Sequence, residues 1–411
     1  MDSSVKLTTP TAAQQAKPRS RIQNLDALRG SVMILMALDH VRDFFHTGAM
    51  SFSPTDLTKT TPILFFTRWI THFCLPVFMF AAGTGAFLWW RQGNHSKREL
   101  SRFLWMRGLW FILLELTVMR FSYNFNFSTR FSIFLLVLWI FGICMIGLAA
   151  LIHLRLRTLA VLSGAVIVGH NCLDPIQASL FGSGAWIWNI LHQPGLFSFA
   201  GTMILISYTF LPWIAVISIG FCFGHVLTLD PSMRRRSMLR IGFVSTIAFV
   251  VIRAVNLYGD PAPWSRQKSA VFTLLSFLNC TKYPGSLDFL LMTLGPALLV
   301  LAYFDRFTFK PTNPLIVFGR VPLFYFVIHF YVIHALAVLL ACVRYGKAAF
   351  SFMFNPPPSM GGPQQLFPPS FGYSLWTAYL VWIAVVLSLY PLCRWFAKVK
   401  LTRRNWWLSY L

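Results

Sequence analysis

The chain has 411 residues, of which 56% are hydrophobic and only 11% are charged. A soluble domain carries about 25% charged residues, so this composition excludes a soluble globular fold and indicates that much of the surface faces lipid. The net charge of +23 would suit a nucleic-acid-binding protein, but the Lys and Arg residues are scattered in short clusters between apolar runs. Such clusters are typical of the cytoplasmic loops of membrane proteins, so we expect a lipid bilayer and no nucleic acid as partner.

Residues 1–20 are rich in Thr, Ala, Gln and Ser, which predicts a disordered cytoplasmic tail. Beyond this tail, the hydropathy predicts an all-α polytopic membrane protein with about ten transmembrane helices in a single domain over residues 21–400, followed by a basic and aromatic tail over residues 401–411. The predicted spans are 26–44, 63–90, 103–119, 131–152, 158–171, 202–228, 239–256, 285–304, 314–342 and 374–393. A further apolar stretch, 270–280, is too short to cross and is predicted to be interfacial or re-entrant.

The distribution of basic residues predicts the orientation of these spans. With the N-terminus inside, most Lys and Arg residues fall in the inner segments, although the outer segments are longer. Both termini are therefore predicted to be cytoplasmic. An additional span at 270–280 would place the basic C-terminal tail outside, against this bias.

The cysteines indicate no metal site. None of the seven belongs to a CxxC motif, and most lie in apolar runs, where Cys behaves as a small hydrophobic residue. We expect no bound metal. Cys172 and Cys280 fall in predicted outer segments, and whether they pair stays open.

Ionisable residues in the predicted spans gather toward the outer ends. A charged group at the centre of a span costs roughly 2.5–3.5 kcal/mol, so those that are present are usually functional or paired. The outer or mid-membrane set is Asp39, His40, Arg42, Asp43, His46, Arg68, His72, Glu115, His170, Asp174, Arg253, Asn256, Lys282, Asp288, His329 and His334. Interactions that only join helices have no reason to concentrate on one side, so this set predicts a polar site.

Helical spacing predicts which of these residues share a face. His40 and Asp43 are three residues apart, and so are Asp43 and His46, whereas Arg68 and His72 are four apart. A carboxylate beside an imidazole fixes its tautomer and supports the imidazolium that proton transfer creates. His40 with Asp43 is therefore the leading catalytic pair. The alternative is that such pairs only hold helices together.

Arginines at the inner side form a second candidate set. They could bind the phosphates of a nucleotide-bearing donor. This predicted donor-binding set comprises Arg29, Arg98, Arg102, Arg107 and Arg320. The positive-inside bias is the alternative explanation for these residues. Five aromatic residues in predicted outer segments are candidates for stacking on a sugar ring, although an interfacial aromatic belt would look the same: Tyr123, Trp186, Trp188, Trp264 and Tyr283.

Several motifs resemble the bacterial relatives of the heparan-α-glucosaminide N-acetyltransferase catalytic domain. The resemblance covers essentially the whole chain after residue 20. The opening of the first span also resembles the wider membrane acyltransferase superfamily, in which a His at the position of His40 ends the first span. The segments that carry the resemblance are Leu25 to Gly30, Asp39 to Phe45, Phe65 to Pro76, Leu191 to Gly195, Thr281 to Pro284, Phe318 to Leu323 and Trp406 to Leu411.

The resemblance implies an inner-membrane enzyme that moves an acetyl or similar acyl group from cytosolic acyl-CoA to an envelope sugar or glycolipid on the outer side. Heparan sulfate itself is not expected as substrate, because the chain lacks the additional luminal domain of the lysosomal enzyme. His40 or His46 would act as general base or transient acyl acceptor, with Asp43 and Asp39 beside it. The predicted substrate-binding residues are Arg68, His72, His192, Arg253, Lys282, His329 and His334.

Two alternatives stay open. A transporter or channel for protons or a small anion could use the same polar residues, but it predicts internal repeats, and no convincing repeat is present. A non-catalytic assembly subunit would not need so many ionisable groups. Association of two copies into a homodimer is also left open.

Overall fold

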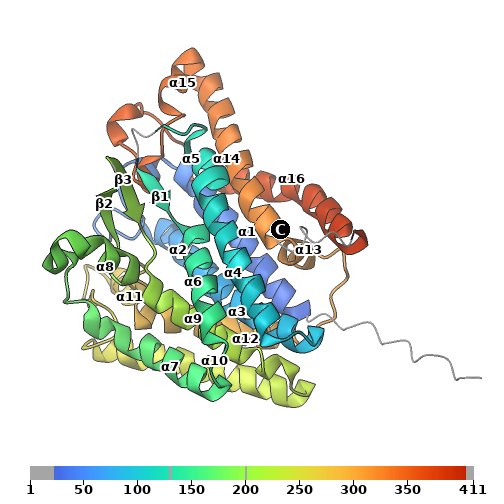
Figure 1. Cartoon of the computed structure of the whole chain (residues 1–411). Coiled ribbons are helices and arrows are strands. Elements are labelled where there is room, and N and C mark those ends of the chain that lie inside the picture. The colour runs from blue at the N-terminus through green and yellow to red at the C-terminus, as the bar shows by residue number, and fades with distance from the viewer. Residues whose placement is uncertain (1–22, 129–131, 200, 404–411) are drawn as a thin grey trace, which may run out of the picture.

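The computed structural model describes residues 23–128, 132–199 and 201–403. The chain forms an elongated bundle in which α1 lies among α3, α12, α13, α14 and α16 (Figure 1). The longer helices are α1 (Gln23–Phe45), α2 (Pro62–Thr71), α3 (Cys74–Gly93), α4 (Lys97–Leu114), α6 (Val137–Leu151), α7 (Leu156–Gly169), α9 (Phe210–Phe223), α10 (Pro231–Val255), α12 (Leu287–Phe304), α14 (Pro322–Tyr345) and α16 (Leu375–Thr402). The shorter helices are α5 (Arg120–Asn124), α8 (Ala185–Leu191), α11 (Ala270–Leu278), α13 (Pro314–Arg320) and α15 (Ala349–Phe352).

Among the described residues, seven helical stretches are long and apolar enough to cross a membrane, and each coincides with a predicted span. The chain is therefore a polytopic membrane protein. The seven stretches are Pro62–Gly93, Leu156–Leu173, Phe210–Thr228, Pro231–Val255, Leu287–Phe304, Pro322–Phe352 and Leu375–Thr402. The other predicted spans coincide with α1 and α4, which carry several charged residues, and with α6, which has only 15 residues. A count of ten spans stays a prediction.

The prediction of an all-α fold is wrong in one detail. A three-stranded sheet in the order β1-β3-β2 is formed by β1 (Ile133–Leu135), β2 (Gly195–Phe199) and β3 (Thr202–Ile206). Strand β1 runs parallel to β3, and β2 is antiparallel to it. The predicted span 202–228 thus starts in a strand, and its helix begins only at Phe210. A short apolar run does not distinguish a buried strand from a helix by periodicity.

Glycines set the closest helix crossings. A Cβ built on Gly108 of α4 would lie 2.6 Å from the carbonyl oxygen of Gly142 in α6, and one built on Gly142 would lie 2.7 Å from the carbonyl oxygen of Gly108. Gly30 of α1 and Gly319 of α13 likewise each meet the backbone of the opposite helix. Small residues permit this approach because backbone packing, rather than hydrophobic burial, joins helices in lipid.

Other predictions concern short segments and the termini. The stretch at 270–280 forms a helix of 9 residues, α11, which is too short to cross a membrane; that it is interfacial or re-entrant stays a prediction. Cys172 is exposed, Cys280 is buried, and both are free thiols. The predicted tail over residues 1–20 lies outside the described residues, as do residues 404–411 of the predicted C-terminal tail.

Candidate functional site

A polar cavity of about 630 Å³ opens where α1 ends. Its lining residues come from α1, α2, α5, α6, β3 and α14 and from the segments around 49–54, 207–208, 282–283 and 358–364, so groups far apart in the chain meet there. Its ionisable lining residues are Asp39, His40, Arg42, Asp43, Arg68, Lys282, Tyr123, Tyr208 and Tyr283. We call this space the outer cavity, after its predicted side of the membrane.

A buried ion-pair network forms one wall of the outer cavity. Arg42 Nη2 lies 3.0 Å from Asp39 Oδ1 and 2.6 Å from Asp43 Oδ1. Arg68 Nη1 of α2 donates to Asp39 Oδ2. Asp39 thereby bridges two arginines from different helices, and the paired charges offset the large cost of burying each of them.

His40 lies beside this network, as its spacing predicts. Its Nδ1 is 3.5 Å from Asp43 Oδ2, and its ring centroid is 4.1 Å from that of Phe330. The His329 ring centroid lies 5.3 Å away. His40 is the one member of this histidine pair that lines the cavity, because His329 is fully buried behind it and donates from Nδ1 to the Tyr325 carbonyl at 3.0 Å.

Lys282 reaches the outer cavity from the connection before α12. Its Nζ lies 5.3 Å from the ring centroid of Tyr283 and 5.9 Å from that of Tyr208, and the two phenols are 3.3 Å apart. Within the described residues no carboxylate lies within 4.0 Å of Lys282, unlike Arg42 and Arg68. Burial raises the pKa of the Tyr208 phenol well above its usual value, so this group is a neutral donor.

His46 and His72 lie near the outer cavity but not in its wall. His46 follows α1 and is half-buried, with its ring against Gly48. Burial and the neighbouring Arg42 lower the pKa of His46, which favours the neutral imidazole. His72 is buried with its ring 5.5 Å from that of Phe289.

Three predicted substrate-binding residues, Arg253, His192 and His334, instead bind other groups of the protein. Arg253 donates to the backbone carbonyls of Phe277, Ala262, Ser276 and Asn279, and so fixes α11 against α10. His192 Nε2 lies 2.9 Å from Asp174 Oδ1. His334 has both ring nitrogens within 2.9 Å of carbonyl oxygens, those of Ser122 and Met353. None of these three residues lines the outer cavity, so the prediction that His334 belongs to the same polar site as His40 is not supported by its position.

A second cavity, of about 400 Å³, penetrates from the end of the bundle where α1 begins. We call it the inner cavity. Its basic lining residues are Arg29, Arg107, Arg320 and Lys400, and most of the remaining wall is apolar or aromatic. The guanidinium of Arg107 lies 5.3 Å from the ring centroid of Phe111.

The predicted donor-binding set is divided by the structure. Arg29, Arg107 and Arg320 line the inner cavity, whereas Arg98 and Arg102 are exposed on α4 and do not. Lys400 was missed because the last span was predicted to end at residue 393, but α16 continues to Thr402. A basic residue about two helical turns beyond a predicted span end was the signal that could have identified it.

The two cavities adjoin inside the bundle. Val137 at the start of α6 and Phe326 on α14 line both of them. Phe326 also packs against the His329 and Phe330 rings, with centroids 5.7 and 5.8 Å away. The inner cavity therefore ends one aromatic layer from His40. Among the described residues no group of His, Cys, Asp and Glu could hold a metal ion.

The sequence was compared with known proteins and with protein families. A search of curated proteins gave no match. The family profile described as heparan-alpha-glucosaminide N-acetyltransferase, catalytic, matches residues 21–258, more than half of the chain. The match includes α1, α2 and α4, which supply the His40 network and two of the inner arginines, and it ends before Lys282 and Arg320. The chain belongs to the heparan-α-glucosaminide N-acetyltransferase catalytic domain family.

Proposed function

We propose that this protein is a membrane acyltransferase that moves an acetyl or similar acyl group from acyl-CoA to a hydroxyl or amine of an envelope sugar or glycolipid. The observation that carries the proposal is the junction of the two cavities at Val137 and Phe326, beside His40. A donor entering one cavity and an acceptor entering the other would meet at this layer. Membership of the family supports acetyl-CoA as the donor.

The inner cavity suits the donor. Guanidinium groups bind phosphate oxygens through paired hydrogen bonds, so Arg29, Arg107 and Arg320 are suited to the phosphates of CoA. The apolar wall beyond them, with Met33 and Leu138, suits the flexible thioester arm. The acyl carbonyl would then lie close to Phe326.

His40 is the proposed general base, with Asp43 as the group that orients it. The imidazole takes the proton from the acceptor hydroxyl or amine while the acceptor oxygen or nitrogen bonds to the acyl carbon. The thioester C–S bond breaks, and CoA leaves as the thiol after receiving a proton. Transient acylation of His40 followed by transfer is the second route, with the same overall balance.

Lys282 is the proposed partner of the developing oxyanion or of the acceptor. Arg68 is already paired with Asp39, whereas among the described residues no carboxylate lies within 4.0 Å of Lys282. A cation with an uncommitted charge stabilises a new negative charge more effectively. Tyr283, which is 40% exposed beside Lys282, offers a ring on which a sugar could stack, whereas the predicted stacking residue Tyr123 is buried against Phe330.

The proposed orientation follows the basic residues. We place the end with Arg29, Arg320 and Lys400 in the cytosol and the outer cavity on the far side of the inner membrane, with ten spans that include α1, α4 and α6. This arrangement would let a cytosolic donor acylate an acceptor outside without CoA crossing.

Transfer of radiolabel from acetyl-CoA by purified protein, offered a panel of amino sugars and glycolipids, tests the proposal. His40→Ala should reduce transfer at least about a hundredfold, the usual contribution of a general base. His153→Ala removes an exposed histidine and serves as the matched control. Transfer that persists in His40→Ala but fails in His46→Ala would move the role to His46, and solute transport without acyl turnover would support the transporter alternative.

A further inference from the structure

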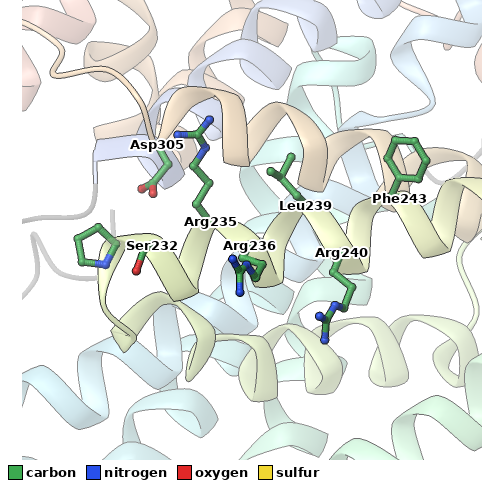
Figure 2. A pocket seen from close by; sticks show the side chains of 8 residues that line it. Ser232, Arg235, Arg236, Leu239, Arg240, Phe243 and Asp305 are labelled. Atoms are coloured by element: carbon green, nitrogen blue, oxygen red, sulfur yellow. The ribbon is translucent and has the colours of Figure 1, made fainter.

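A basic groove with a volume of about 730 Å³ runs along the first half of α10, separate from both cavities. Figure 2 shows Arg236 and Arg240 extending from one edge of α10 and Arg235 from the other, toward Asp305 at the end of α12. Leu239 and Phe243 continue the groove along the helix.

The acidic residue of the groove is already neutralised. Arg234 Nη2 and Nε lie 2.9 and 3.1 Å from the Asp305 carboxylate oxygens, and Asn24 of α1 donates to the same carboxylate at 2.8 Å. Within the described residues no carboxylate lies within 4.0 Å of Arg235, Arg236 or Arg240. The groove therefore carries a net positive charge that the protein does not balance.

The spacing of two of these arginines brings their positive charges close together. Arg236 and Arg240 are four residues apart on α10, so their side chains are neighbours on one helix face. Like charges at this spacing destabilise a helix, and an anion held between them removes the repulsion. A phosphate group between two guanidinium groups also receives paired charge-assisted hydrogen bonds.

The apolar continuation of the groove identifies the source of the phosphate. Phe243 is 61% exposed, and Val244 and Ile247 are 62% and 51% exposed on the following turns. Helix α10 is apolar enough to span a membrane, so this surface faces acyl chains. A soluble phosphate compound would leave that surface unused, whereas a phospholipid matches both parts.

We propose that the α10 groove binds one anionic glycerophospholipid, with its phosphate between Arg236 and Arg240, its polar headgroup toward Arg235, and its acyl chains along Leu239 and Phe243. Basic pockets at the membrane surface are suited to such headgroups. The groove shares no lining residue with the inner cavity, so this lipid would bind independently of the acyl donor.

Native mass spectrometry of the full-length protein in neutral detergent, titrated with phosphatidylglycerol or phosphatidylcholine of the same acyl chains, tests the proposal. We expect one tightly bound phosphatidylglycerol per chain and at least about tenfold weaker binding of phosphatidylcholine. Arg236→Gln combined with Arg240→Gln should weaken phosphatidylglycerol at least about tenfold. Arg240→Gln alone, a milder change, should weaken it by an intermediate factor.

The matched control is Arg98→Gln combined with Arg102→Gln, an exposed pair with the same spacing on α4 outside the groove. This control should leave the tightly bound lipid in place. Equal loss in both double variants would overturn the proposal, because general attraction to basic surface would then explain the binding. Displacement of the lipid by inorganic phosphate or CoA at similar concentrations would also overturn it, because the site would then take a soluble anion.

Discussion

Asp39 holds together the polar wall of the outer cavity. It is the shared carboxylate of Arg42 and Arg68, and all three side chains are largely buried. Removing one member of such a network leaves the other charges buried without compensation, which is far more destabilising than loss of a surface pair. The same network holds Arg42 beside Asp43, the group that we propose orients His40.

Replacing Asp39 with Asn should therefore lower the free energy of unfolding by about 3–5 kcal/mol, because Arg42 and Arg68 lose their shared counter-charge. Thermal or denaturant unfolding in detergent measures the effect. Asp56→Asn, in an exposed turn where the carboxylate only meets Thr58, is the control and should change stability by less than about 1 kcal/mol. Equal stability of the two variants would contradict this role of Asp39.

His46 gives a pH dependence with a defined sign. Burial and Arg42 lower its pKa in the folded protein, so the unfolded chain binds more protons just below the ordinary His pKa of about 6.5. The contribution of His46 to stability is present above that pH and is lost as the pH falls through it toward the lowered folded value. His46→Asn should therefore lose less thermal stability than the native protein between about pH 7 and pH 5. An unchanged or steeper loss in the variant would contradict this assignment.

At the scale of secondary-structure elements, the crossing of α1 and α13 positions the inner arginines. Gly30 and Gly319 let the two backbones touch, and their neighbours Arg29 and Arg320 both line the inner cavity. The glycine contact thus fixes the distance between two groups proposed to bind one donor. Nothing in the local sequence requires glycine at these positions, since both lie in or at the end of a helix.

Gly30→Val should separate α1 from α13, destabilise the protein by at least about 1–3 kcal/mol, and raise the KM for acetyl-CoA more than it lowers kcat. Unfolding measurements and label-transfer kinetics together check this. Gly164→Val on α7, where an added Cβ meets open space, is the matched control. A variant with normal donor KM would show that the crossing does not position the arginines.

Glu115 illustrates an element-scale contact that sequence spacing could not assign. It begins a π-helical turn after α4, accepts from the Leu138 and Trp139 amides at 2.7 and 3.1 Å, and accepts from the Tyr123 hydroxyl at 2.9 Å. A carboxylate at the N-terminal end of α6 is favoured by the helix dipole. The sequence marked Glu115 only as a polar residue in a span, because its partners lie on other elements.

Across the whole molecule, the sequence predicted that polar residues meet in the outer cavity better than it predicted which residues line that cavity. Helical spacing brings His40, Asp43 and Asp39 together on α1. Arg68 of α2 and Lys282 of the connection before α12 join them in the wall of the outer cavity. His334 and His192 could not be distinguished from them, because one sequence does not show that the first meets backbone carbonyls and the second the Asp174 carboxylate instead of a cavity. The strands β1 and β3 were missed because their apolar residues fall inside predicted spans, whereas β2 lies in a segment predicted to be an outer loop.

The orientation of the whole molecule stays a prediction and has a direct check. A reporter fused after Leu411 should be cytoplasmic, because the basic residues of α16 and of the end at Arg29 lie on one side of the bundle. A reporter inserted in the loop at Lys59 should be on the opposite side. The reverse pattern, or both reporters on one side, would contradict the ten-span arrangement.

We propose that the two cavities form one acyl-transfer path through the membrane. Acetyl transfer in sealed vesicles, with donor and acceptor supplied on opposite sides, is the direct test of this path. Labelled acetyl-CoA is enclosed on the side of Arg29 and Arg320, and an impermeant amino sugar is supplied only on the side of His40 and Lys282. We predict labelled sugar on the side of His40, and loss of this product in His40→Ala but not in His153→Ala. Label that stays in acetyl-CoA on the donor side, or labelling of the sugar that persists in His40→Ala, would contradict a transfer path through the two cavities.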